Sequence, residues 1–146
     1  MFRGQAPRCL ESRTGMNQTT LLIVDDDPAV RKSLVRFLED KGYDIISAES
    51  YEQAIALLGE HCPQLAVVDM RLAGNSGENV ILAAHAMNAS LRFLVYTGSN
   101  TFEVTPAMDK VGIKPEDILH KPVESLSVIQ DAIERILART ENGGES

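Results

Sequence analysis

The feature of this sequence that most constrains its fold is a repeated alternation of short apolar runs with longer amphipathic segments between residues 20 and 139. The apolar runs are rich in β-branched residues and have no polar face, which is typical of strands covered on both sides of a parallel sheet. The intervening segments repeat apolar residues at helical spacing. This alternation predicts an α/β fold, doubly wound around a five-stranded parallel sheet with strand order 2-1-3-4-5.

Turn and capping residues predict the boundaries of these elements. Asp27 and Pro28 suit the N-cap and the first position of a helix. A short helix is predicted over residues 105–111, where a Thr-Pro pair begins it, and the last helix over residues 123–139. The predicted strands cover residues 21–25, 43–48, 65–68, 91–96 and 118–120.

The length and charge of the chain limit its organisation and its partners. Its 146 residues, 44% of them hydrophobic, are enough for one folded domain. We predict a flexible leader over residues 1–18, the folded domain over 19–139 and a polar tail over 140–146. A net charge of -7 argues against direct binding of nucleic acid, because affinity for the phosphate backbone comes mainly from Lys and Arg.

Two further observations predict a cytoplasmic protein that does not bind membranes. No apolar run approaches the roughly 20 residues that span a bilayer, and the first residues contain no stretch that would serve as a signal peptide. The two cysteines, Cys9 and Cys62, are too few for a disulfide framework. We therefore expect both to be reduced thiols.

Polar residues stand where predicted strands end: Asp25, Asp26, Asp69, Thr97 and Lys121. Because right-handed crossovers bring the carboxyl ends of parallel strands to one edge of the sheet, these side chains should converge. Three carboxylates in one crevice repel one another, so the site should raise a pKa or bind a cation. Mg²⁺ is the natural candidate, since it takes oxygen ligands and commonly uses one or two carboxylates with a phosphate oxygen.

This set of residues also predicts a reaction. Once a metal ion and Lys121 neutralise an incoming phosphoryl group, Asp69 can attack phosphorus as a carboxylate nucleophile. Thr97 can donate a hydrogen bond from its hydroxyl. Taken alone, three acids after a strand can be a solvated turn, and Asp27 with Pro28 is most simply a helix cap. The combination, in order on successive strand ends, is what favours a functional site.

Four segments resemble the receiver domain of two-component response regulators: LLIVDDDPAVRKSLVRFLEDKGY, AVVDMRLAGNSG, VYTG and HKP. The resemblance covers about residues 20 to 139 and implies a flavodoxin-like receiver fold. It implies the following roles: Asp69 as phosphoacceptor, Asp25 and Asp26 as the acidic pair that holds Mg²⁺ together with Asp69, Arg71 as a metal ligand through its backbone carbonyl, Thr97 as the switch hydroxyl, and Lys121 as the phosphate-binding lysine. It also implies a cis peptide bond between Lys121 and Pro122.

The resemblance further implies a signalling switch rather than an enzyme. The phosphoryl donor would be a phosphohistidine on a histidine kinase or a phosphotransfer protein. The signal would then leave by docking on a downstream protein, or on a second copy of the chain after phosphorylation. Three departures from the family pattern stand out, one of which is a longer approach to the fifth strand over residues 113–117. The loop after Asp69 lacks the usual proline, which predicts a more mobile loop, and Ile118 occupies a position that is often aromatic.

Two alternative functions remain open at this point. A phosphatase of the haloacid dehalogenase type would use a D-x-D motif at residues 25–27 with Thr97 and Lys121. That interpretation lacks a second acidic pair after the lysine and leaves Asp69 without a role. The other alternative is a receiver-like docking module that is never phosphorylated, against which the complete acidic site argues.

Overall fold

The computed structural model describes residues 19–98 and 104–143, so the predicted leader lies outside the described residues. Five strands form a parallel sheet in the order β2-β1-β3-β6-β7, which confirms the predicted order 2-1-3-4-5. A separate antiparallel pair, β4 and β5, was not predicted. The strands are β1 Thr20–Val24, β2 Asp44–Ala48, β3 Leu65–Val68, β4 Arg71–Leu72, β5 Asn75–Ser76, β6 Arg92–Thr97 and β7 Ile118–His120.

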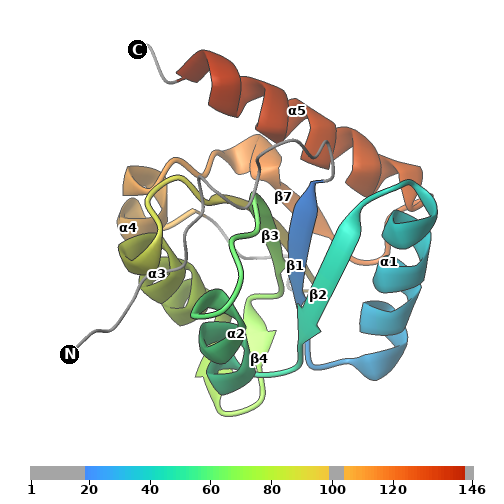
Figure 1. Ribbon diagram of the computed structural model, residues 1–146, viewed down its shortest axis with the longest axis horizontal. Coiled ribbons are helices and arrows are strands. Elements are labelled where there is room, and N and C mark those ends of the chain that lie inside the picture. The colour runs from blue at the N-terminus through green and yellow to red at the C-terminus, as the bar shows by residue number, and fades with distance from the viewer. Residues whose placement is uncertain (1–18, 99–103, 144–146) are drawn as a thin grey trace.

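Helices cover both faces of the sheet (Figure 1). Buried side chains of α1 and α5 pack with one set of strand residues, and those of α2, α3 and α4 pack with the other set. This is the layered arrangement that a doubly wound sheet requires. The helices are α1 Pro28–Asp40, α2 Tyr51–Leu58, α3 Gly77–Met87, α4 Pro106–Lys110 and α5 Ser127–Gly143, with a 3₁₀ turn, η2, at Pro115–Asp117.

Strand β1 shows why its sequence is apolar throughout. Leu21 and Ile23 face the cluster with α1 and α5, whereas Leu22 and Val24 face the cluster with α2, α3 and α4. All four side chains are fully buried. Because successive residues of a strand point to opposite faces, a strand between two helical layers needs apolar residues at every position.

The caps that the sequence predicts are present at the starts of two helices. The Asp27 carboxylate accepts a hydrogen bond from the Ala29 amide at 2.9 Å, and α1 begins at Pro28. The Thr105 hydroxyl accepts from the Met108 amide at 3.2 Å at the start of α4. In both cases a side-chain oxygen satisfies an amide that has no partner inside the helix.

The last helix differs from its prediction at both ends. Helix α5 begins at Ser127, later than the predicted residue 123, and it continues to Gly143, into the predicted polar tail. The Ser125 hydroxyl accepts from the Ser127 amide at 3.2 Å, which forms a turn before the helix begins. The apolar periodicity predicted too early a start, because Val123 and Leu126 precede the helix but pack against the same buried cluster as α5.

The expectation of reduced cysteines is wrong for Cys62, which is disulfide-bonded. Cys9 lies outside the described residues. Over residues 19–98 and 104–143, no helix is both long enough and apolar enough to cross a bilayer.

Candidate functional site

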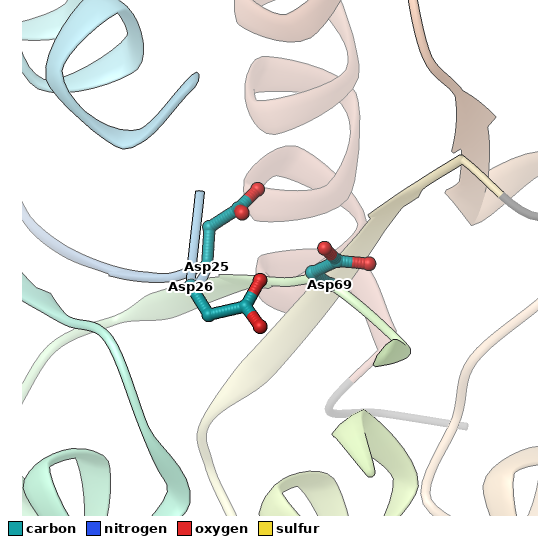
Figure 2. Close-up of side chains that lie close together, drawn as sticks. All are labelled: Asp25, Asp26 and Asp69. Atoms are coloured by element: carbon teal, nitrogen blue, oxygen red, sulfur yellow. The ribbon is translucent and has the colours of Figure 1, made fainter. Parts of the chain in front are cut away.

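Three carboxylates lie together at the carboxyl edge of the sheet, as the strand ends predicted (Figure 2). Asp25 and Asp26 follow β1, and Asp69 follows β3, the neighbouring strand. One carboxylate oxygen from each residue lies within 4.8 Å of those of the other two. Asp25 and Asp69 are buried, with 2% and 7% of their surface exposed, whereas Asp26 is exposed.

A lysine from the edge strand bridges the two buried carboxylates. Lys121 follows β7, and its Nζ lies 2.9 Å from Asp25 Oδ2 and 3.0 Å from Asp69 Oδ2. Its backbone amide donates to the carbonyl oxygen of Thr97 at 2.9 Å, and the Thr97 side chain is buried at the end of β6. The Lys121–Pro122 peptide bond is cis. The predicted residues therefore stand at the ends of four neighbouring strands, and Asp25, Asp69 and Lys121 are in direct side-chain contact.

The sheet itself fixes the backbone of the two buried aspartates. The Asp25 amide donates to Ala48 O at 3.1 Å, and the Asp69 amide donates to Val24 O at 3.0 Å. These bonds extend the parallel ladders one residue beyond β1 and β3. The two carboxylates are therefore attached to backbone that the sheet ladders hold in place, as a preorganised polar site requires.

The electrostatics of the site follow from this crowding. Burial raises the pKa of the Asp25 carboxyl above its ordinary value of 3.8, and the charge of Asp69 acts in the same direction. The Asp27 amide and the Lys121 ammonium oppose this rise. Burial alone would lower the pKa of Lys121, but hydrogen bonds to Asp25 and Asp69 and their charges raise it. The lysine therefore stays charged.

The loop after Asp69 forms a hairpin that closes one side of the site. Strands β4 and β5 pair Arg71 with Ser76 and Leu72 with Asn75. The Arg71 amide donates to Asp69 Oδ1 at 3.2 Å. At the turn, the Ala73 amide donates to Asp26 Oδ2 at 2.9 Å. The hairpin therefore contacts two of the three carboxylates through backbone amides.

Sequence reasoning missed two residues that support the site. Arg31 donates from Nη1 to the Asp25 carbonyl oxygen at 2.8 Å and lies 3.6 Å from Glu49. A Cβ at Gly77 would lie 2.2 Å from the backbone oxygen of Asp69, so α3 can approach the site only with glycine there. The sequence does contain a signal for each of them: Arg31 lies in the first turn of the helix that follows the aspartates, and Gly77 directly follows the serine that caps α3.

The donor set fits a hard divalent cation. Mg²⁺ binds oxygen at 2.0–2.1 Å, so two opposite ligands stand about 4.2 Å apart. The three carboxylate oxygens lie within 4.8 Å of one another, close to that separation. Asp27, in contrast, is occupied in capping α1 through its carboxylate. Asp27 would be the second acid of a D-x-D phosphatase motif, and as a helix cap it is not available for catalysis.

Comparisons with known proteins give matches over most of the chain. A family model described as "Response regulator receiver domain" matches residues 21–134. The acid tolerance regulatory protein ActR of Rhizobium meliloti (strain 1021) is 34% identical over 122 residues, which are 84% of this chain and 62% of that protein. The chain thus spans less than two thirds of the length of this relative.

Solved structures show the same fold at lower identity. A CheY-like receiver domain protein from Methanospirillum hungatei JF-1 has a TM-score of 0.78 at 24% identity, over 87% of this chain and 99% of that one. A response regulator protein from Burkholderia pseudomallei has a TM-score of 0.72 at 24% identity, over 87% and 73% of the two chains. That structure is described as holding a phosphorylated aspartic acid, a calcium ion and citrate.

Proposed function

The chain belongs to the response regulator receiver domain family, and from this premise we propose that it is a phosphoacceptor switch of a two-component system or phosphorelay. In this proposal residues 19–139 are the receiver domain and Asp69 takes the phosphoryl group. One observation carries the proposal: Asp69 lies beside two other carboxylates and within 3.0 Å of the partly buried ammonium group of Lys121. An acidic group in that setting is suited to receive a phosphoryl group and to stabilise its charge.

The transfer step involves one bond formed and one broken. An Asp69 carboxylate oxygen attacks the phosphorus of a phosphohistidine, and the histidine nitrogen keeps the electron pair of the broken N–P bond. Lys121 has three N–H donors, of which Asp25 and Asp69 accept two. The third can donate to an oxygen of the incoming group. The Thr97 hydroxyl is proposed as a second donor to that group.

We assign the metal site to Asp25, Asp26, Asp69 and the backbone carbonyl of Arg71. Mg²⁺ bound there would neutralise the negative charge on the phosphoryl oxygens. A phosphorylated aspartic acid and a calcium ion are both reported for the Burkholderia pseudomallei protein, which supports a divalent cation site in a phosphorylated chain of this fold. The choice of Mg²⁺ rests on the all-oxygen donor set and on the phosphate oxygen that would complete it.

The proposal also names partners and a location. The donor is a histidine kinase or a phosphotransfer protein, and the output is docking on a downstream protein or on a second phosphorylated copy. We propose a cytoplasmic location, because the family to which the chain belongs signals through cytoplasmic proteins. Signalling rather than enzymatic turnover follows from a site that modifies its own Asp69.

Labelling with acetyl phosphate and Mg²⁺, followed by intact mass measurement, tests the assignment. The wild type should gain the mass of one phosphoryl group, and Asp69→Asn should gain none. Asp27→Asn is the matched control, because it makes the same carboxylate-to-amide change in an acid that caps α1, where asparagine caps equally well. That variant should be labelled like the wild type.

Other outcomes of this experiment would point to the alternative functions. Undiminished labelling of Asp69→Asn contradicts the assignment of the phosphoacceptor. Release of phosphate that depends on Asp25 and Asp27 would indicate a phosphatase of the haloacid dehalogenase type. A wild type that gains no mass would indicate a docking module without phosphorylation.

A further inference from the structure

The hairpin beside Asp69 makes a contact that the roles assigned above do not use. Its turn residue Ala73 donates its backbone amide to Asp26 Oδ2 at 2.9 Å, across 47 residues of sequence. Asp26 is the exposed member of the carboxylate cluster. The two buried members share Lys121. The Ala73 amide therefore contacts the one carboxylate that the lysine does not bridge.

The hairpin is built to present this amide. Leu72 pairs with Asn75, so Ala73 and Gly74 form a two-residue turn. The φ of Gly74 is +76°, a value typical of the third position of a type II turn. The Ala73 amide takes no part in the strand pairing, because β4 and β5 pair only through the residues before Ala73 and after Gly74. It is thus available for a partner outside the hairpin.

Contacts at the base of the hairpin hold the turn in place. The Asn75 side-chain oxygen accepts from the Ser76 amide at 2.9 Å and from Asn79 Nδ2 at 2.6 Å, on the first turn of α3. The Gly77 amide donates to Met70 O at 2.9 Å. The hairpin is therefore anchored to α3 at one end and to the end of β3 at the other.

An exposed aspartate has several rotamers available, and binding a metal through it requires one of them. We propose that the β4–β5 hairpin positions Asp26 for the metal, with the Ala73 amide fixing the carboxylate in the orientation that joins it to Asp25 and Asp69. The inference rests on the proposed function, since it takes this cluster as the metal site. It makes Ala73 a positioning residue that acts through Asp26.

The coupling is reciprocal. If the amide favours the metal-binding orientation of Asp26, a bound metal must in turn favour the hydrogen bond to the amide. Occupancy of the site should therefore restrain the turn of the hairpin next to Asp69. In the wild type, Mg²⁺ should slow the exchange of the Ala73 amide with solvent, measured by NMR.

Substitution at Ala73 isolates the amide. Ala73→Pro removes the N–H, and proline is favoured at the second position of a type II turn. Ala73→Ser keeps the amide at an exposed position and is the matched control. In Mg²⁺ titrations followed by amide NMR shifts, Ala73→Pro should bind Mg²⁺ between about threefold and tenfold more weakly, as expected for the loss of one intramolecular hydrogen bond at an exposed carboxylate. Ala73→Ser should bind as the wild type does.

A double-mutant cycle separates positioning from general damage to the loop. In an Asp26→Ala background the Ala73→Pro substitution should weaken Mg²⁺ binding no further, because alanine has no side-chain oxygen to accept the Ala73 amide. Unchanged affinity in Ala73→Pro, or equal weakening in both backgrounds, overturns the inference while leaving the metal site intact. A wild type that does not bind Mg²⁺ overturns the proposed metal site itself, and the inference with it.

Discussion

Substitution of Gly77 by alanine should destabilise the protein, because the added methyl group has no room. The Cβ would lie 2.2 Å from Asp69 O, 2.7 Å from Met70 Cε and 2.8 Å from Met70 Cα. The Met70 side chain can move, but the Asp69 backbone is held in place because its amide donates a hydrogen bond to Val24 O at 3.0 Å. The start of α3 or the hairpin must therefore shift.

The magnitude follows from two opposing effects. Overpacking against fixed backbone costs about 3 kcal/mol, at the upper end of the usual range. In the opposite direction, alanine stabilises the folded state by about 1 kcal/mol, because it lowers the conformational entropy of the unfolded chain. The net loss is about 2 kcal/mol, which lowers the melting temperature of a domain of this size by about 8 °C. Urea unfolding and a thermal melt measure both quantities.

Gly59→Ala is the matched control for this prediction. Gly59 ends α2 with a φ of -74°, and a Cβ there would lie 3.4 Å from Ala56 O, an ordinary contact. That variant should match or exceed the wild type in stability. Acetyl phosphate labelling of Gly77→Ala, at a temperature where it is folded, should also be slower, because the shift occurs at the Asp69 backbone. If the two alanine variants are equally stable, the steric argument is wrong.

Two further predictions concern buried carboxylates. Asp117, 1% exposed, accepts from Arg139 Nη2 at 2.6 Å and pairs with Arg135 at 3.4 Å. Asp117→Asn should lower the free energy of unfolding, measured in urea, by about 1–2 kcal/mol, which is less than for a fully buried ion pair because both arginines are partly exposed. The control is Glu116→Gln, which removes the exposed ion pair between Glu116 and Arg139 at 3.7 Å and should lower it by less than about 0.5 kcal/mol. The raised pKa of Asp25 means that the folded state holds its proton to higher pH than the unfolded chain, so this residue lowers stability as the pH rises above 3.8. The difference between the unfolding free energies of the wild type and Asp25→Asn, measured in urea, should therefore decrease as the pH rises above 3.8. A difference that increases with pH would show that burial does not raise the pKa of Asp25.

Local sequence rules predicted much of the fold. The period of two within a strand and of 3.6 within a helix depends on the backbone alone, so β-branched runs and amphipathic segments identified the five sheet strands. Caps are equally local, as Asp27 at α1 shows. The hairpin was not predicted, because a two-residue strand has too few residues to show any period.

The site divides in the same way. The sequence alone determined that Asp25, Asp26 and Asp69 would meet, because the handedness of strand crossovers brings strand ends to one edge. Only the tertiary structure decided which group touches which: Lys121 bridges Asp25 and Asp69, and the amide of Ala73 contacts Asp26. The Ala73–Asp26 and Lys121–Asp69 contacts join residues 47 and 52 positions apart, and the Lys121–Asp25 contact joins residues farther apart still. They depend on side-chain rotamers and turn geometry in the packed molecule, which no periodicity of the sequence encodes.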